Sequence, residues 1–104
     1  MNQDYPELQQ FLAGYFNQDW MHDHKSASDV IDFFISDVSA DILFQVQSEL
    51  DRLIKTKKTE QELQDYLFTD IGCYYYYVND WKDARTWLRH VASALEGSKA
   101  SNKK

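Results

Sequence analysis

Apolar residues recur every three or four positions along much of the chain, which is the spacing of one buried face of an α-helix. The longest such pattern follows Ser39 and comprises Ile42, Leu43, Val46, Leu50, Leu53 and Ile54. The Ser39 hydroxyl can accept a hydrogen bond from a free N–H at the helix start, and Asp41 suits the positive end of the helix dipole. We therefore predict a helix that begins after Ser39, ends near the lysines at positions 55, 57 and 58, and buries Leu50.

The N-terminal third of the chain predicts two helices separated by a polar loop. Pro6 suits the first turn of a helix, and the apolar spacing that follows it ends before Trp20. The polar segment Asp19–Lys25 is predicted to be a loop. Ser26 or Ser28 can cap the second helix, whose predicted apolar face consists of Val30, Phe33 and Phe34.

Two more helices are predicted in the C-terminal half. Thr59 and Glu62 have the spacing of a capping box, in which a hydroxyl and a carboxylate each accept a hydrogen bond from the other residue's N–H. Gly72 is expected to interrupt the chain after that helix. Asp80 is a candidate cap for the last helix, and Gly97 is expected to end it.

These patterns describe an all-α protein, a single small domain of about five helices. A chain of 104 residues has the size of one domain. It contains only 3 Gly and 1 Pro, which are too few turn-forming residues for a barrel or sandwich of many short strands. We assign residues 1–97 to the helical domain and residues 98–104 to a disordered basic tail.

The charge of the chain is uneven and favours a basic partner. The formal net charge is −6, but residues 98–104 contain three lysines and no acid. The rest of the chain carries 8 basic and 17 acidic residues, a net charge of −9. A domain this acidic is not expected to bind nucleic acid, because phosphate binding needs basic side chains. It would be attracted to a basic protein, although acidity also serves solubility.

Neither a disulfide nor a membrane segment is indicated. Cys73 is the only cysteine, so it cannot form an internal disulfide, and its apolar neighbours predict a small core residue. The N-terminus lacks the basic and then apolar pattern of a signal peptide. No apolar run approaches the ~20 residues needed to span a bilayer. We expect a soluble cytoplasmic protein that does not bind membranes.

Four consecutive tyrosines, Tyr74–Tyr77, follow Gly72 and Cys73 and precede Trp81 and Trp87. In a strand, alternate rings would point to opposite faces, and in a helix the rings would spread over most of the circumference. Some of them should therefore reach the surface, where tyrosine offers a large rigid contact area with a polar end. The alternative is a half-buried connection whose phenol oxygens reach water.

Candidate catalytic chemistry is sparse. The sequence His22-Asp23-His24, with Asp19 nearby, contains suitable zinc ligands, but a polar loop with two histidines explains it equally well. No histidine lies near Cys73 in the sequence, and no phosphate-binding glycine loop or hydrolase motif is present. We expect no catalytic residue, no bound metal and no cofactor, so the protein is not expected to be an enzyme.

Two segments resemble a known family. Tyr15-Phe16-Asn17-Gln18-Asp19-Trp20 is similar to a motif of the immunity proteins of contact-dependent growth inhibition. The segment Gly72-Cys73-Tyr74-Tyr75, followed by Trp87-Leu88-Arg89, is similar to the C-terminal pattern of the same family. The resemblance covers most of residues 6–95. It implies a small cytoplasmic protein that binds a toxin domain delivered by a neighbouring bacterium and blocks it.

The resemblance also implies the chemistry of the partner. Many toxins of these systems are nucleases, so the expected partner is a basic, nucleic-acid-binding toxin domain whose active site an acidic inhibitor could occlude. We predict the following toxin-binding residues: Asp19, Asp23, Asp29, Asp32, Asp37, Tyr75 and Tyr77. The alternative is a helical adaptor or regulatory module with another protein partner. The identity of the toxin, the reaction it catalyses and the oligomeric state of the chain stay open.

Overall fold

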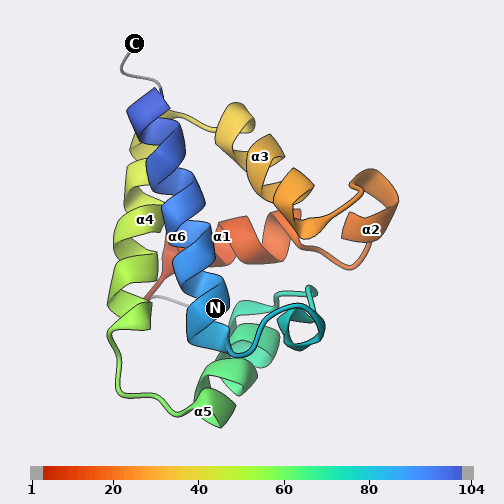
Figure 1. Ribbon diagram of the computed structural model, residues 1–104, viewed down its shortest axis with the longest axis vertical. Helices are drawn as coiled ribbons and strands as arrows, with labels where there is room; N and C mark the ends of the chain where they lie inside the picture. The colour runs from red at the N-terminus through yellow and green to blue at the C-terminus, as the bar shows by residue number, and fades with distance from the viewer. Residues whose placement is uncertain (1–3, 102–104) are drawn as a thin grey trace.

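The computed structural model describes residues 4–101, and their side chains to residue 97, as helices joined by short connections (Figure 1). The α-helices of this part of the chain are α1 (Pro6–Tyr15), α2 (Trp20–Asp23), α3 (Ala27–Asp37), α4 (Ala40–Ile54), α5 (Glu60–Asp65) and α6 (Ala84–Ser101). A π-helix, η1 (Tyr66–Ile71), continues α5, and a 3-10 helix, η2 (Tyr77–Asn79), precedes α6. Residues 4–101 contain no strand, which confirms the predicted all-α fold. Within the same range, no helix combines the length and apolar character that crossing a bilayer requires.

Helices α4 and α6 form an antiparallel pair along the longest dimension of the molecule (Figure 1). In the middle of α4, Gln47 Nε2 donates to Glu96 Oε1 of α6 at 3.0 Å. Where α4 ends and α6 begins, Arg85 Nε donates to Ile54 O at 2.9 Å. Helix α1 crosses behind the pair, α3 lies toward one end of it, and α5 lies toward the other. Apolar side chains from these elements meet in one core.

Local capping signals set the starts of three helices as predicted. Ser26 Oγ and Ser39 Oγ each accept the N–H of the residue three positions later, at 3.1 and 3.4 Å. Thr59 and Glu62 form the predicted capping box, with reciprocal hydrogen bonds of 3.2 and 2.8 Å. Each bond satisfies an N–H that has no acceptor within its own helix.

Two carboxylates from other helices also cap helix starts. Glu49 on α4 is only 4% exposed, and its Oε1 accepts the N–H of Leu8 in the first turn of α1 at 2.8 Å. Glu60 Oε1 on α5 accepts the N–H of Ala84 at the start of α6 at 2.9 Å. A carboxylate suits the partial positive charge of a helix N-terminus, so both bonds stabilise contacts between helices.

The start of the last helix differs from the prediction. Asp80 does not cap α6, because its Oδ2 accepts the Tyr75 hydroxyl at 2.6 Å instead. Asp83 caps α6 instead, because its Oδ1 accepts the N–H of Thr86 at 2.8 Å. The hydrogen bonds from Thr86 lower the pKa of the Asp83 carboxyl. The cap is therefore three residues later than the sequence suggested.

Two further boundary predictions are wrong. The segment Trp20–Asp23, predicted as part of a loop, forms the short helix α2, and Trp20 itself is buried against the core. Gly97 does not end α6, which continues to Ser101. A glycine inside a helix costs about 1 kcal/mol relative to alanine but does not force the helix to end. The predicted tail therefore begins as helix, and residues 102–104 lie outside the described residues.

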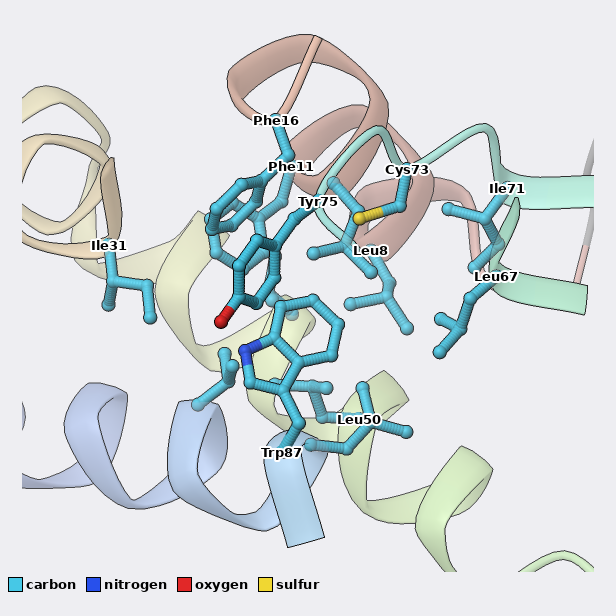
Figure 2. Packing of buried hydrophobic residues seen from close by; sticks show 14 of the residues in the cluster. Leu8, Phe11, Phe16, Ile31, Leu50, Leu67, Ile71, Cys73, Tyr75 and Trp87 are labelled. Atoms are coloured by element: carbon cyan, nitrogen blue, oxygen red, sulfur yellow. The ribbon is translucent and has the colours of Figure 1, made fainter. Parts of the chain in front are cut away.

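The apolar stripe predicted on residues 42–54 faces the core along α4. Its central members Leu43, Val46, Leu50 and Leu53 are buried, and Ile42 and Ile54 at its ends are partly buried. Leu50 has no exposed area and lies in the same cluster as Trp87 of α6 (Figure 2).

Replacing Leu50 with Ala should lower the free energy of unfolding by about 2–5 kcal/mol, because it removes buried apolar surface and leaves a cavity. Urea denaturation followed by circular dichroism measures this value. The matched control is Gln45→Ala on the exposed side of α4, for which we expect a change within about 0.5 kcal/mol. Similar effects of the two substitutions would contradict the assignment of the buried face.

The single cysteine is a core residue, as predicted. Cys73 is 4% exposed, and burial raises the pKa of its thiol to about 12. Its sulfur lies among apolar side chains that include Leu8 and Tyr75 (Figure 2). Since the thiolate is the reactive form, Cys73 is protected from reagents both by its raised pKa, which keeps the thiol protonated, and by its burial.

We expect Cys73 in the folded protein to react with a chromogenic disulfide reagent at about pH 8 far more slowly than in denaturant. The absorbance of the released thiol, followed over time with and without urea, gives both rates. Rapid labelling of the folded protein would contradict the buried position and would indicate a thiol available for redox chemistry.

Candidate functional site

The four consecutive tyrosines divide into two buried and two exposed rings. Gly72 follows the π-helix with a φ of 84°, a left-handed conformation that favours glycine, and residues 72–76 are not helical. Tyr74 and Tyr76 are 61% and 54% exposed, whereas Tyr75 and Tyr77 are 5% and 0% exposed. This alternation is typical of an extended segment at the edge of a core, because successive side chains point to opposite sides.

Tyr75 and Tyr77 pack against Trp87 in the core. The centroids of their rings lie 5.1 and 5.8 Å from that of Trp87, and the Tyr77 ring is inclined to it by only 3°. Their hydroxyls donate to Asp80 Oδ2 at 2.6 Å and to Glu60 Oε2 at 2.8 Å. Burial is the main reason that the pKa values of both phenols are raised, and the carboxylate partners raise them further.

This placement corrects two of the predicted contact residues. Rings as buried as Tyr75 and Tyr77 offer a partner almost no surface, so in this conformation they stabilise the core instead. Tyr74 and Tyr76 are the rings that reach the surface. The sequence predicted that some rings would do so, but four identical residues carry no pattern that shows which of them face inward.

The five predicted acidic contact residues are all exposed. Asp19 directly precedes α2, and Asp23 is its last residue. Asp29, Asp32 and Asp37 belong to α3. At 100° per residue, positions 29 and 32 fall on the side of α3 opposite its buried residues, which are Val30, Ile31 and Phe34. Asp37 is on the same side as Val30, at the last turn of the helix. We call the exposed residues of α2 and α3 together with Asp19 the acidic surface.

Two apolar side chains that the sequence analysis missed lie on the acidic surface. Phe33 is 48% exposed and Met21 is 73% exposed. Phe33 was predicted to be part of the buried face, but it lies outside the arc of α3 that Val30, Ile31 and Phe34 bury.

Several contacts hold the acidic surface in place. The Tyr15 hydroxyl of α1 donates to Asp37 Oδ2 at 2.6 Å. Burial, and then the Asp37 carboxylate, raises the pKa of Tyr15 to about 12. His24 Nδ1 lies 3.4 Å from Asp29 Oδ2, and the His24 ring lies 5.2 Å from that of Phe33. These contacts join α1 and the end of α2 to α3.

The histidines do not gather a metal-binding group in the described part of the chain. No cluster of three or more His, Cys, Asp and Glu side chains suited to a metal ion occurs there. His22 is exposed at the surface, and His24 contacts Asp29 and Phe33. The arrangement around His24 is that of an ordinary surface contact between the α2–α3 turn and α3.

Comparisons with known proteins agree with the sequence motifs. No curated protein matches the chain at a significant level. The family model of the CdiI immunity protein matches residues 4–95. One chain of the crystal structure of the CdiA-CT/CdiI complex from Y. kristensenii 33638 is 31% identical and superimposes with a TM-score of 0.86. This similarity covers 89% of the present chain and 99% of the other.

The family match and the structural similarity extend over the segments that carry the motifs at both ends of the domain. They confirm the resemblance that these motifs indicated. The chain belongs to the CdiI immunity protein family.

Proposed function

We propose that the chain is a stoichiometric inhibitor that binds the CdiA-CT toxin domain encoded beside it and protects the cell that produces it. It acts by binding and not by catalysis. The observation that carries the proposal is the relative at 31% identity, whose structure is that of a CdiA-CT/CdiI complex. The TM-score of 0.86 extends this similarity from the sequence to the whole arrangement of helices.

The acidic surface supports a partner with a basic contact region. Its five exposed carboxylates belong to the same part of the chain as two exposed apolar side chains, Phe33 and Met21. Charges at such a surface speed the encounter with an oppositely charged protein, while buried apolar and aromatic side chains set how slowly the complex dissociates. The combination therefore suits an interface with an apolar centre and an acidic rim.

The same charge suggests how inhibition would work. A nuclease binds the phosphates of its substrate through Lys and Arg side chains. Carboxylates of Asp23, Asp29 and Asp32 could occupy those basic groups and exclude the nucleic acid. We propose on this ground that the toxin is a nuclease and that the chain occludes its active site. Equimolar inhibitor should then abolish cleavage of RNA or DNA by the toxin domain in a gel assay.

The proposal predicts that charge on the acidic surface governs association. Replacing both Asp23 and Asp32 with Lys should slow binding to the toxin domain and weaken the dependence of the association rate on salt. Surface plasmon resonance at several salt concentrations measures this. The matched control, Asp65→Lys with Asp70→Lys, changes the net charge equally on α5 and η1 and should affect association much less.

A second prediction concerns the apolar centre of the same surface. Phe33→Ala should leave association nearly unchanged and should speed dissociation, with a loss of ~2 kcal/mol if the ring is a binding hot spot. Circular dichroism checks that the variant is folded. If the aspartate and Phe33 variants leave both rates unchanged, the docking surface lies elsewhere. If the unmodified chain does not bind the toxin domain, the proposed function fails.

A further inference from the structure

A pocket of about 230 Å³ lies where the start of α3 meets α6. Ser28 and Ile31 line it on the side of α3, and Tyr75 and Asp80 line it on the side of the segment before α6. Trp87 of α6 has no exposed area, so it lies at the inner end of the pocket. We call this the Trp87 pocket. Since about 15 Å³ is enough for one water molecule, the pocket has room for a side chain.

The indole N–H of Trp87 is a buried donor without an acceptor. Its Nε1 has no hydrogen-bond partner among the described residues. Figure 2 shows this nitrogen on the edge of the indole that faces the Tyr75 hydroxyl oxygen, on the side where Ile31 lies, and both of these residues line the pocket. An unpaired buried donor is unfavourable, so an occupant that brings an acceptor into the pocket would gain a hydrogen bond.

Asp80 places an acceptor close to this donor. Its Oδ2 accepts the Tyr75 hydroxyl at 2.6 Å, and the exposed carboxylate lines the same pocket. A carboxylate can accept several hydrogen bonds, so the Tyr75 hydroxyl does not exhaust it. Because the Tyr75 hydroxyl is bonded to Asp80 and faces the indole nitrogen of Trp87, one ligand can reach both groups.

A neutral group with an acceptor and a donor on neighbouring atoms fits this pair. A primary amide carries both on one carbon, so its oxygen can accept from Trp87 Nε1 while its nitrogen donates to Asp80. A carboxylate fits less well, because it would bring a second negative charge close to Asp80. An ammonium or guanidinium group has no acceptor and would leave the indole N–H unpaired. The pocket therefore favours the side chain of Asn or Gln.

The Trp87 pocket adjoins the acidic surface. Ser28 lines the pocket and is exposed, so it belongs to both. Asp32 lies one turn later on the same side of α3, because residues four apart are neighbours on a helix. A protein bound to the acidic surface would therefore hold its own side chains at the mouth of the pocket.

We infer that the Trp87 pocket binds the side-chain amide of an Asn or Gln residue of the toxin domain. The inference rests on the proposed function and adds to it a contact that depends on hydrogen bonds and not on charge. The acidic surface attracts the toxin domain, and the pocket then fixes the position of one of its side chains.

Nuclear magnetic resonance of the free protein tests the pocket with a small amide. The chain contains three tryptophans, so its proton–nitrogen correlation spectrum has three indole signals. Trp20→Phe and Trp81→Phe each remove one signal and so assign the third to Trp87, which stays intact. Titration with propionamide should move the Trp87 proton to higher chemical shift and reach saturation, because hydrogen bonding deshields the proton. The Trp20 signal is the reference, since its Nε1 already donates to Tyr74 O at 3.4 Å.

Propionate, which has the shape of propionamide, shows which chemistry the pocket prefers. At equal concentration it should move the Trp87 signal less than propionamide does, because Asp80 repels it. A larger shift with propionate would assign the pocket to a carboxylate and overturn the inference. The absence of a saturable shift with propionamide would overturn it too and would leave the indole N–H to an ordered water molecule.

The toxin domain itself tests the occupant. Its binding should move the Trp87 signal in the same direction as propionamide does. Ala substitution of one exposed Asn or Gln of the toxin domain should abolish this shift, whereas substitution of the others should preserve it. If the shift survives every such substitution, no side-chain amide of the toxin domain enters the pocket and the inference is wrong.

A substitution at the mouth of the pocket gives a second readout. Ser28→Leu places a larger side chain there and should raise Kd for the toxin domain about tenfold, measured by isothermal titration calorimetry. The matched control, Ser48→Leu on the exposed side of α4, should leave Kd within about twofold. Circular dichroism and thermal unfolding check that both variants fold. Equal Kd values for the two folded variants would contradict the inference.

Two outcomes separate this inference from the proposed function. If the unmodified chain binds the toxin domain while the Trp87 signal stays in place, the inference is wrong and the proposed function stands. If propionamide enters the pocket but the unmodified chain does not bind the toxin domain, the proposed function fails, and the toxin domain fails as the occupant with it.

Discussion

The structure depends on the contact of Tyr75 and Tyr77 with Trp87. The two rings bring the non-helical segment after Gly72 against α6, and the Tyr75 ring also stacks on Phe16 at the end of α1, 5.4 Å between centroids (Figure 2). Both hydroxyls are hydrogen-bonded to carboxylates, so the buried phenols leave no unpaired polar group. Because side chains alternate along this segment, burying two rings directs the other two to the surface. The same contact therefore sets the core and selects the exposed tyrosines.

The carboxylates of the chain have two roles. Some accept hydrogen bonds at helix starts, and others face solvent, where a partner can contact them. Glu49, Glu60 and Asp83 accept hydrogen bonds from N–H groups at helix starts. The aspartates of α2 and α3 are exposed, as are Met21 of α2 and Phe33 of α3. An overall charge of −6 therefore understates the acidity of this part of the chain, because residues 19–37 contain five aspartates and one lysine. The proposed recognition of a basic protein rests on this distribution more than on the net charge.

Local signals in the sequence were sufficient for much of the fold and for little of the site. The α4 stripe, the serine caps and the Thr59 capping box were predictable, because each depends on residues within a few positions of one another. The cap on α1 from Glu49 and the burial of Tyr75 and Tyr77 were not, because they depend on contacts between distant segments. The exposure of Phe33 was not predictable either, because consecutive residues of one helix can both be buried, as Val30 and Ile31 are. The acidic positions on α3 were predictable as exposed residues, but their apolar neighbours were not.

The central proposal is that the chain binds its toxin domain through the acidic surface on α2 and α3. Amide hydrogen exchange, measured by mass spectrometry with and without the cognate toxin domain, tests it most directly. The account predicts slower exchange in the peptides that cover α2 and α3. Protection confined to the peptides that cover residues 72–79 and α5, or no protection anywhere, would contradict it.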